Sequence, residues 1–435
     1  MTYPQTLNYL YTRLPMYQRQ GAAAMKKDLT NIRLLLDELD HPEQQLRFVH
    51  VGGTNGKGTV SHLLAAALQA HGFTVGLYTS PHYKDFRERI KINGEFISRD
   101  EVVAFVEQMQ PAIEHIEPSF FEITVAMALH HFARAQVQWV ILEVGLGGRL
   151  DSTNVVDPVL SVITNIGYDH MQFLGDTLPE IAYEKAGIIK ANRPVIIGLT
   201  QAETEPVFRK KAREVGSPIT FADQVYQLRA NYTRDDDYTR QHLYSNEAIA
   251  DFNFPFPVAA AGPYVAENHR TALAALLRLA EDGHLDLAPN AVERAWLQLH
   301  ELTYYIGRWQ VLGDSPLTVA DSAHNAEGLG PVISLLNELN AYRKGHQHFV
   351  LGVVNDKDLH RVLPLFPTNA SYYFVKADIP RGLPAEELMD AAAEYGLVGI
   401  ECATVNQGLA AAKKTAEAHD IIFIGGSVFT VAEIL

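Results

Sequence analysis

The most informative stretch of the chain is Gly53-Thr54-Asn55-Gly56-Lys57-Gly58-Thr59. The apolar run 47–51 before it predicts a buried strand, and residues 60–71 after it predict a helix. A glycine-rich turn from a strand into a helix directs backbone N–H groups and the positive end of the helix dipole at one point. Lys57 adds a positive charge there, and Thr59 adds a hydroxyl suited to Mg²⁺. The stretch therefore predicts a site for a nucleoside triphosphate.

The agreement with the strict phosphate-loop pattern G-x-x-x-x-G-K-[ST] is incomplete. Val51 stands at the first glycine position, and Gly58 separates Lys57 from Thr59. An ordinary tight turn is the alternative interpretation of such a loop. The strand before it and the helix after it favour the phosphate site.

Composition limits the class of protein. A chain of 435 residues with 47% hydrophobic and 20% charged residues predicts a globular enzyme of two domains. The formal net charge of −15 argues against binding to nucleic acid or to an anionic membrane. The single cysteine, Cys402, fits a reducing cytosol. The N-terminus does not resemble a signal peptide, and no apolar run approaches ~18 residues. We therefore expect a cytoplasmic monomer with small-molecule partners.

Apolar runs alternate with helical patterns, which predicts an α/β fold with parallel sheets. Strands are expected at 74–78, 139–144, 159–166 and 194–198, and again at 317–320, 348–353, 371–375, 400–405 and 421–424. Residues 223–257 are polar, include Asp235-Asp236-Asp237, and look more like hairpins. The boundary expected at 299–305 separates a nucleotide-binding domain from a smaller, doubly wound domain.

Acidic and metal-binding side chains follow the expected strands, where open α/β sheets bind ligands. Glu143 ends one strand and is placed to hold Mg²⁺, as the acidic residue of P-loop enzymes does. Ser80, Asp169 and His170 follow two other strands. Two of these residues have a plain alternative role: Glu143 as the cap of a turn, and His170 as a polar surface or core residue. Their shared edge of the sheet favours a metal site.

Further motifs occur in a fixed order along nearly the whole chain. They are Thr54-Asn55-Gly56-Lys57-Gly58-Thr59, Thr79-Ser80-Pro81-His82, Phe121-Glu122, Glu143-Val144-Gly145-Leu146-Gly147-Gly148-Arg149-Leu150-Asp151-Ser152-Thr153-Asn154, Asp169-His170, Glu184-Lys185-Ala186-Gly187-Ile188-Ile189, Asn268, Gly307-Arg308, Asp321-Ser322-Ala323-His324-Asn325, Asp356-Lys357-Asp358 and Gly426-Ser427. Together they resemble the folylpolyglutamate synthase/dihydrofolate synthase family, a branch of the Mur ligases.

The resemblance implies an ATP-dependent amide ligase that works through an acyl phosphate. Residues 1–299 would form the P-loop domain that binds ATP and folate, and 306–435 a Rossmann-like domain for glutamate ligation. The enzyme would join L-glutamate to the γ-carboxylate of a folate and, in some members of the family, to dihydropteroate.

The resemblance also implies roles for individual residues. ATP would be held by the loop 54–59 with Asn268, Arg308 and Asp321, and two Mg²⁺ sites by Thr59, Ser80, Glu143, His170 and Lys185. The folate or dihydropteroate would contact Phe121, Glu122, Asp151, Ser152 and Thr153, and the incoming glutamate would contact His324 and Ser427. Catalysis would use Lys57, His170, Lys185, Arg308 and His324.

Lys185 is implied to be carbamylated by CO₂, because a free ammonium beside Mg²⁺ makes poor electrostatic sense. The alternative is a lysine that favours the dipole at a helix C-terminus. Ile306 and Ser322 depart from the family pattern, which has Pro and Gly there, and a positive φ at 322 would strain a serine. The segment 16–28 also fits poorly, so a second, dihydrofolate synthase activity stays open.

Three other functions remain as alternatives. A noncatalytic nucleotide-binding scaffold would have no reason to place Glu143, His170 and Lys185 beside the phosphates. A cell-wall precursor ligase shares the loop but carries a UDP-binding domain before it, and only 46 residues precede Arg47. A P-loop switch GTPase needs an Asn-Lys-x-Asp motif, which Asn355-Asp356-Lys357-Asp358 does not match in order.

Overall fold

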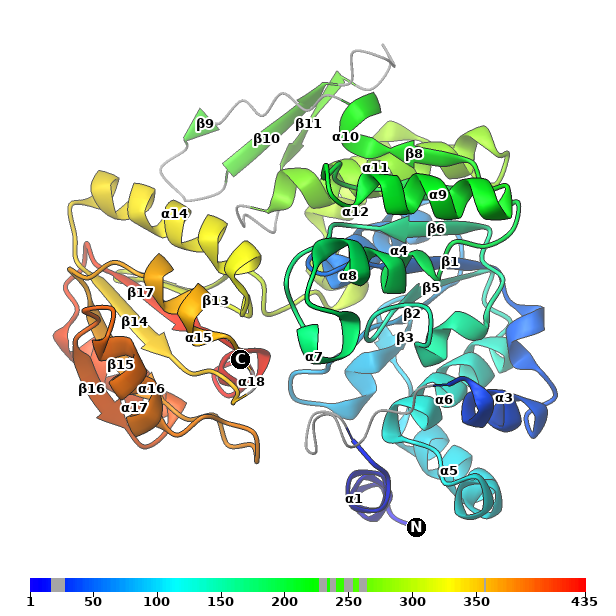
Figure 1. The fold of residues 1–435 in the computed structure, drawn as a ribbon, viewed down its shortest axis with the longest axis horizontal. Coiled ribbons are helices and arrows are strands. Elements are labelled where there is room, and N and C mark those ends of the chain that lie inside the picture. Colours follow the sequence, from blue (N-terminus) through cyan, green and yellow to red (C-terminus); the bar gives the residue numbers. More distant parts are fainter. Residues whose placement is uncertain (17–27, 227–232, 235–239, 246–252, 258–263, 356) are drawn as a thin grey trace. The chain divides into compact units, whose positions relative to one another are not determined.

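The computed structural model describes residues 1–16, 28–226, 233–234, 240–245, 253–257, 264–355 and 357–435. Asp356, the run 235–237 and most of segment 16–28 lie outside these ranges. The chain divides into two compact units (Figure 1). The first comprises Met1–Ala259 and Ala266–Tyr305, and the second Ala260–Val265 and Ile306–Leu435.

The first unit is built on an eight-stranded sheet of order β4-β3-β2-β5-β1-β6-β7-β8. All its strands are parallel except β3 and β4, which pair antiparallel at one edge. The strands are β1 Phe48–Gly52, β2 Val75–Tyr78, β3 Ile90–Ile92, β4 Glu95–Phe96, β5 Trp139–Glu143, β6 Leu160–Ile163, β7 Val195–Ile197 and β8 Ile219–Phe221. Since β1, β2, β5 and β6 are parallel, their carboxyl ends meet at one edge.

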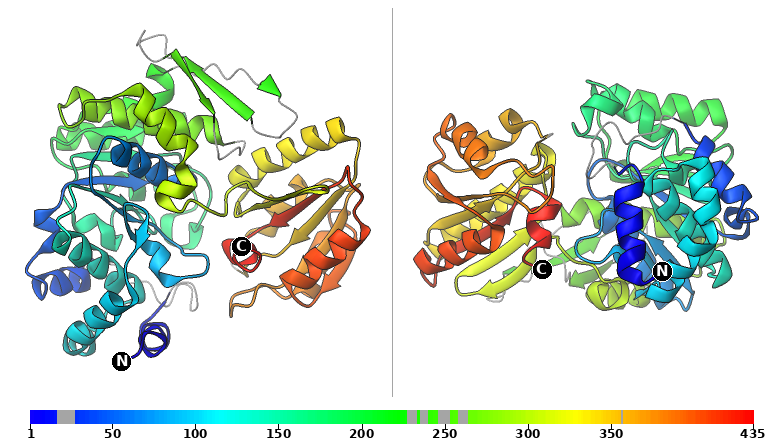
Figure 2. Two further views of the ribbon diagram at one scale, coloured as in Figure 1. Left: turned by 180° about the vertical axis from the view of Figure 1, so that it is seen from behind. Right: turned by 90° about the horizontal axis from the view of Figure 1, so that it is seen from below.

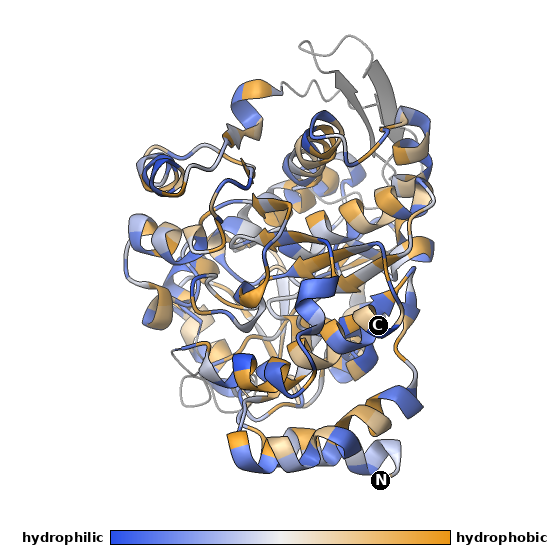
Figure 3. Ribbon diagram, turned by 90° about the vertical axis from the view of Figure 1, so that its right-hand side faces the viewer, coloured by the Kyte–Doolittle hydropathy of each residue, from blue (hydrophilic) through white to orange (hydrophobic). Residues whose placement is uncertain are grey.

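Helices surround this sheet. They are α1 Tyr3–Arg13, α3 Thr30–Asp37, α4 Lys57–Ala70, α5 Arg99–Ile116, α6 Phe120–Arg134, α7 Met171–Leu174, α8 Leu178–Ala186, α9 Glu205–Val215, α10 Ala222–Val225, α11 Val265–Glu281, α12 Pro289–Leu297 and α13 Leu299–Thr303. Short 3₁₀ turns lie at η2 Pro42–Gln45, η3 Phe86–Arg89 and η4 Ser152–Val155. Figure 3 shows the strands as mostly hydrophobic and the helices as banded with polar residues, which is the pattern of elements that bury one face.

Helix α4 differs from the others because it is buried from Thr59 through Leu68. It contacts β1, β2 and β5 on the sheet and also α12 and α13. The indole N–H of Trp296 donates to the carbonyl oxygen of Leu63 at 3.0 Å. A helix that is apolar around its whole circumference needs such cover on all sides. The loop before α4 is thereby anchored to the centre of the unit.

The second unit contains a six-stranded sheet of order β12-β13-β17-β14-β15-β16, parallel except for β12 (Figure 2). Its strands are β12 Gln310–Asp314, β13 Leu317–Asp321, β14 Gln347–Leu351, β15 Ser371–Val375, β16 Gly399–Cys402 and β17 Ile421–Gly425. Its helices are α14 Ala326–Arg343, α15 Leu359–Val362, α16 Ala385–Ala393, α17 Val405–Thr415 and α18 Val428–Ala432, with η5 Leu363–Leu365. The predicted mixed α/β fold with two mostly parallel sheets is confirmed.

Several predicted strand boundaries were wrong, two of them by three residues. The strand expected at 400–405 ends at Cys402, because the side chain of Thr404 accepts a hydrogen bond from the Gln407 N–H at 3.1 Å and starts α17. The strand expected at 159–166 ends at Ile163. The hairpin prediction for 223–257 corresponds in part to a small sheet of β9 Thr233–Arg234, β10 Arg240–Ser245 and β11 Asn253–Pro257. In the described ranges, no helix is long and apolar enough to cross a membrane.

Candidate functional site

The phosphate-loop candidate is a half-exposed turn between the buried strand β1 and the buried helix α4. Its shape is held by the loop after β6. The N–H of Thr54 donates to the carbonyl oxygen of Asn165 at 2.8 Å, and the N–H of Asn55 to the Asn165 side chain at 3.0 Å. The hydroxyl of Thr164 donates to the Asn55 carbonyl at 2.5 Å. The turn is therefore fixed before any ligand arrives.

Asn268 on α11 lies against this turn. Gly56 has φ +83°, and a Cβ added to it would come within 2.1 Å of the Asn268 Oδ1 atom. Only glycine fits there, both for its backbone conformation and for this close approach. The Asn268 side chain is 4% exposed, and its Nδ2 is buried without a partner among the described residues. A buried amide donor without a partner costs free energy, so it suits a ligand placed at the loop.

The ammonium groups of Lys57 and Lys185 converge on one backbone oxygen. Lys57 Nζ donates to the carbonyl oxygen of Gly53 at 3.1 Å, and Lys185 Nζ to the same atom at 2.9 Å. Burial, with the nearby Lys57 charge, lowers the pKa of Lys185 to about 7, although Asp169 and Asp151 oppose the shift. The Lys185 amine therefore becomes neutral at a lower pH than an ordinary lysine does.

The structure brings Glu143 and Ser80 together beside the first turn of α4. Glu143 Oε2 accepts a hydrogen bond from the Ser80 N–H at 2.9 Å. A Cβ added to Gly58 would lie 3.5 Å from Glu143 Oε1. The Thr59 hydroxyl is paired with the Tyr305 hydroxyl at 2.9 Å.

These oxygen donors fit Mg²⁺. The described residues hold no group of three or more His, Cys, Asp or Glu side chains that could bind a metal by themselves. Mg²⁺ seldom uses such a cage, because it binds through one or two carboxylates, retained waters and substrate phosphates. One buried carboxylate, Glu143, with the Thr59 hydroxyl in the first turn of α4, matches this preference.

His170 precedes α7 with φ +53°, a left-handed conformation that is uncommon outside glycine. Its Nε2 lies 3.8 Å from Asp169 Oδ2. Asp169 is also one of the charges that act on Lys185. Asp169 thus lies on the Lys185 side of the loop, with His170 beside it.

The loop Gly145–Asn154 follows Glu143 directly and is organised by Asp151. The Asp151 carboxylate accepts hydrogen bonds from the Leu146 N–H at 2.8 Å and from the Thr153 N–H and hydroxyl at 3.0 and 2.5 Å. Burial raises the pKa of Asp151, against these hydrogen bonds. His50, at the centre of β1, pairs with the Thr153 hydroxyl at 2.8 Å.

Phe121 packs against the start of the same loop. A Cβ added to Gly145 would lie 2.4 Å from the Phe121 ring, so this position needs glycine. The carboxylate of Glu122 is used within its own helix, where it accepts from the Ser119 N–H at 2.7 Å in a capping box. Ser152 is half-buried in the turn η4. Among the predicted acceptor residues, Phe121, Asp151, Ser152 and Thr153 lie on or against one loop.

In the second unit, a network of hydrogen bonds holds the turn that carries Arg308. Gly307 has φ +73°, and its carbonyl oxygen accepts from the Ser322 N–H and hydroxyl at 3.1 and 2.8 Å. Asp321 Oδ2 accepts from the Trp309 N–H at 2.7 Å and from the Tyr264 hydroxyl. Ser322 does not have a positive φ, so the strain considered for it does not arise. Its side chain instead ties down the turn that lacks the family's proline.

His324 and Ser427 have structural partners of their own. His324 Nδ1 pairs with the Ser322 carbonyl oxygen at 3.0 Å. Ser427 is buried and caps α18, where it accepts from the Thr430 N–H at 3.0 Å. Both follow carboxyl ends of strands in the second unit, next to Asp321 of β13 and Gly425 of β17. Their roles toward glutamate stay predictions.

Comparison with known proteins identifies the family. The Mur ligase middle domain matches residues 51–276, and the Mur ligase glutamate ligase domain matches residues 307–428. A Bacillus subtilis protein named dihydrofolate synthase/folylpolyglutamate synthase is 32% identical over 89% of this chain and 88% of its own length. The chain belongs to the folylpolyglutamate synthase/dihydrofolate synthase family. This places it among the ATP-dependent, amide-forming Mur ligases, as the motifs predicted.

Other members of the family agree with this. A Haloferax volcanii protein named probable bifunctional folylpolyglutamate synthase/dihydropteroate synthase is 33% identical over the whole chain, which spans 50% of that protein's length. The structure of Escherichia coli FolC in complex with DHPP and ADP superposes with a TM-score of 0.81 at 29% identity, covering 100% of this chain and 97% of that one. A bifunctional family member with Mn, AMPPNP and L-glutamate bound gives 0.80 at 27% identity, with coverage of 100% and 97%.

Several residues that shape the site in this chain are not predicted from the sequence. Asn165 falls inside the expected strand 159–166, although it follows β6 and folds back onto the phosphate loop. His50 falls in the expected buried strand 47–51, and Tyr305 falls at the expected domain boundary. Only a side chain's polarity inside an apolar run, as at His50, could have drawn attention to any of them.

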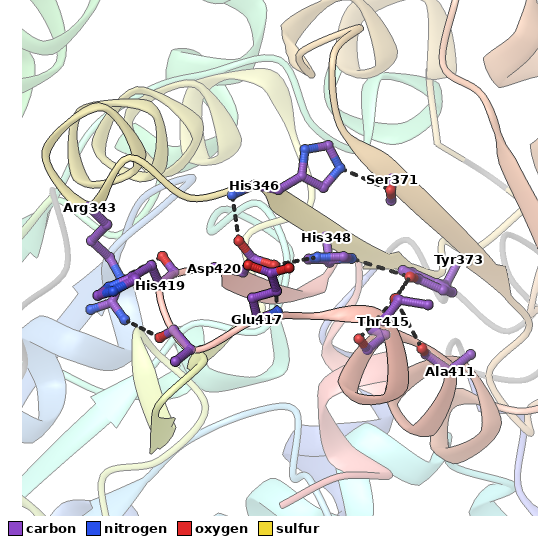
Figure 4. Close-up of polar contacts among 12 residues, drawn as sticks. Arg343, His346, His348, Ser371, Tyr373, Ala411, Thr415, Glu417, His419 and Asp420 are labelled. Carbon is purple, nitrogen blue, oxygen red and sulfur yellow. Dashed lines mark hydrogen bonds and ion pairs between the residues drawn. The ribbon is translucent and has the colours of Figure 1, made fainter.

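A second polar cluster lies apart from the predicted residues. Figure 4 shows His348 between Asp420 and Tyr373, with His346 beside it. Asp420 precedes β17, so the cluster is at the amino ends of the strands, while Asp321 lies at the carboxyl ends. Because the cluster lies at the edge of the sheet opposite Asp321, we interpret it as a structural feature of the second unit.

Proposed function

We propose that this chain is a folylpolyglutamate synthase that joins the amino group of L-glutamate to the γ-carboxylate of a folate. One observation carries the proposal. Glu143, the proposed metal ligand, ends β5, and the proposed acceptor loop 145–154 begins two residues later. Nucleotide chemistry and acceptor binding would thus meet at the end of a single buried strand.

The reaction would proceed in two steps. The γ-carboxylate of the folate attacks the γ-phosphorus of ATP, giving an acyl phosphate and ADP. The glutamate amine then attacks the acyl carbon, and phosphate leaves from the tetrahedral intermediate as the amine loses its proton. The first step brings two anions together, so positive charge at the phosphates lowers its barrier.

The loop residues supply that charge and hold the nucleotide. Lys57 and the N–H groups at the start of α4 would bind the phosphates, and the Asn268 amide would gain the partner it lacks here. From the second unit, Arg308 and Asp321 would contact ATP. Asp321 is already engaged by Trp309 and Tyr264, so a nucleotide contact would have to share or replace one of these.

Thr59, Ser80, Glu143 and His170 would hold Mg²⁺, with Lys185 at a second site. The ion would screen the phosphate charges during transfer. Structures of relatives were solved with ADP, or with AMPPNP and Mn, which supports a nucleotide and a divalent cation.

Phe121, Asp151, Ser152 and Thr153 would bind the pterin-bearing acceptor, with Glu122 holding the start of α6. His324 and Ser427 would meet the incoming glutamate. Dihydropteroate is a second candidate acceptor, because the Bacillus relative carries both activities in its name. Action in the cytoplasm as a monomer stays a prediction.

Lys185 is proposed to carry a carbamate. A neutral lysine amine attacks CO₂ and loses one proton, giving a carbamate anion, an oxygen ligand suited to Mg²⁺. The lowered pKa of about 7 supplies the neutral amine. The repulsion between Lys57 and Lys185, both on the Gly53 carbonyl oxygen, would also be removed.

The test is to incubate the protein with ATP, Mg²⁺ and L-glutamate and with one acceptor at a time, then to read the products by mass. We expect a gain of one glutamate on a reduced folate and release of ADP that depends on both substrates. Dihydropteroate tests the second activity. Ligation of UDP-muramoyl substrates instead would assign the chain to the cell-wall ligases, and GTP turnover without either substrate would exclude a ligase.

A further inference from the structure

The hydroxyl of Thr59 is paired with a residue that the proposed function does not use. Its Oγ1 lies 2.9 Å from the hydroxyl oxygen of Tyr305, and the two side chains are 3% and 9% exposed. Thr59 stands in the first turn of α4, whereas Tyr305 is the last residue of the first unit. The contact therefore joins the phosphate loop to the end of that unit's chain.

Tyr305 is held rigidly where it is. Its ring packs edge-on against His62, with ring centres 5.2 Å apart. His62 Nδ1 lies 2.7 Å from the Thr303 hydroxyl, which donates its own proton to the Leu299 carbonyl at 2.6 Å. His62 must therefore be the donor in this pair. The carbonyl oxygen of Tyr305 pairs with His300 Nδ1 at 3.0 Å.

We infer that Tyr305 is a positioning residue that orients the Thr59 hydroxyl toward the metal of a bound Mg–nucleotide. The inference rests on the proposed role of Thr59. A hydroxyl has one proton and two lone pairs. When a lone pair of Thr59 faces a cation, its proton points away from the cation and needs an acceptor, which the buried Tyr305 oxygen provides. Such second partners orient metal ligands and raise metal affinity.

The Tyr305 hydroxyl acts on the nucleotide through Thr59, the proposed metal ligand. Loss of this hydroxyl should therefore weaken the Mg-bound nucleotide and leave the metal-free one unaffected.

The test compares Tyr305→Phe with Tyr304→Phe. Both changes remove one phenolic hydroxyl and keep the ring. Tyr304 packs against Phe96, with ring centres 4.8 Å apart, and is 37% exposed. Calorimetry would measure the affinity for a nonhydrolysable ATP analogue with Mg²⁺ and with EDTA, without folate or glutamate. We expect Tyr305→Phe to weaken the Mg²⁺-dependent affinity about tenfold, to leave the EDTA value unchanged, and Tyr304→Phe to change neither.

A double-mutant cycle makes the test independent of stability. If Tyr305 acts through Thr59, adding Thr59→Val to Tyr305→Phe should cost no more Mg²⁺-dependent affinity than Thr59→Val alone. Additive effects would overturn the inference, as would equal losses with and without Mg²⁺. Tighter binding by Tyr305→Phe would also overturn it and make the tyrosine an obstruction. Because no acceptor is present, failure of the folate proposal would leave these results unaffected.

Discussion

One backbone oxygen, that of Gly53, accepts hydrogen bonds from both Lys57 and Lys185. Two ammonium groups on the same atom repel each other, and burial adds to the cost of charge on Lys185. The residue that is proposed to carry a carbamate is thus placed where burial and the nearby Lys57 charge destabilise its positive charge. This was not visible in the sequence, where the two lysines are 128 positions apart.

Replacing Lys185 with alanine should reduce ligation at least a hundredfold, because a metal ligand would be lost. Short carboxylates such as acetate should restore part of the rate by occupying the vacant ligand position. In the unmodified protein, activation by CO₂ should increase as the pH rises through about 7, where the buried amine becomes neutral. Steady-state rates of the variant with and without acetate would measure the first effect, and rates of the unmodified protein with and without bicarbonate the second.

Lys210 on α9 provides the control, since its side chain is 74% exposed and pairs only weakly with Glu214, at 4.0 Å. Lys210→Ala should be active and insensitive to acetate. Full activity of Lys185→Ala, together with an unmodified mass for the peptide that contains this lysine, would end the carbamate proposal.

Asp420 has a different, structural task at the opposite edge of the second sheet. Burial by itself would raise its pKa, but hydrogen bonds from the Glu417 and His346 N–H groups and from His348 hold the pKa of Asp420 below its ordinary value. Burial likewise lowers the pKa of His348, although Asp420 opposes that shift. The folded state therefore favours an ionised Asp420 and a neutral His348.

Asp420→Asn should lower the free energy of unfolding by about 1.5–3 kcal/mol at pH 7, the range for hydrogen bonds to a charged group. A depressed carboxyl pKa stabilises the fold above the unfolded value of about 3.9 and loses this effect as the pH falls through the folded value. The difference from wild type should therefore shrink below pH ~4. Denaturant unfolding at several pH values measures this, with the exposed Asp390→Asn on α16 as control. A pH-independent difference would contradict it.

At the scale of elements, α4 shows why a single helix can carry the nucleotide site. Gly56 is the N-cap residue just before α4, and Gly72 follows the C-cap residue at its other end; the two glycines have almost the same φ, +83° and +85°. A Cβ at Gly72 would meet nothing within 4 Å, whereas one at Gly56 would come within 2.1 Å of Asn268. The two glycines therefore form a matched pair for mutation, because they share a backbone conformation and differ in the space around an added Cβ.

Gly56→Ala and Gly72→Ala should each cost about 1 kcal/mol of stability, because both force alanine into a left-handed conformation. Only Gly56→Ala should also weaken ATP binding, by at least tenfold, because it displaces the Asn268 amide from the loop. Thermal unfolding measures the first effect, and nucleotide titration the second. Equal ATP affinities in the two variants would show that Asn268 does not help to bind the nucleotide.

At the scale of the whole molecule, the two units carry different parts of the proposed machinery. The phosphate loop lies in the first and Arg308 in the second. The Arg308 turn is held by Ser322, Asp321 and Gln310, the last of which accepts from the Gly307 N–H at 3.0 Å. We expect catalysis to require that this arginine reach the phosphates of ATP, as domain closure would allow.

Arg308→Ala should lower kcat at least tenfold, about 1.4 kcal/mol of barrier. Arg308→Lys should recover only part of it, since a lysine offers one compact charge where the guanidinium binds two phosphate oxygens. Arg361→Ala, an exposed arginine of the same unit that pairs with Asp358 at 3.4 Å, is the control. Near-normal turnover of Arg308→Ala with an unchanged melting temperature would show that the side chain points elsewhere.

The sequence by itself determined the α/β class, the phosphate loop, the family and nearly every long element. These follow from patterns within short windows: buried strands are continuous apolar runs, helices have a 3.6-residue period, and the loop's glycines lie between one strand and one helix. The short strands β3, β4 and β12, at or next to a sheet edge, were not predicted, because runs of two to five residues carry little periodicity.

The tertiary structure alone decided which side chains meet. Lys185 with the Gly53 carbonyl, His50 with Thr153, and Thr59 with Tyr305 are joined across 132, 103 and 246 positions. Such pairs arise because parallel strands gather their carboxyl ends at one edge, while the order of the strands, β2-β5-β1-β6, differs from their order in the chain. Local propensity does not depend on the order of the strands, so the polar contacts that shape the site could be identified only from the tertiary structure.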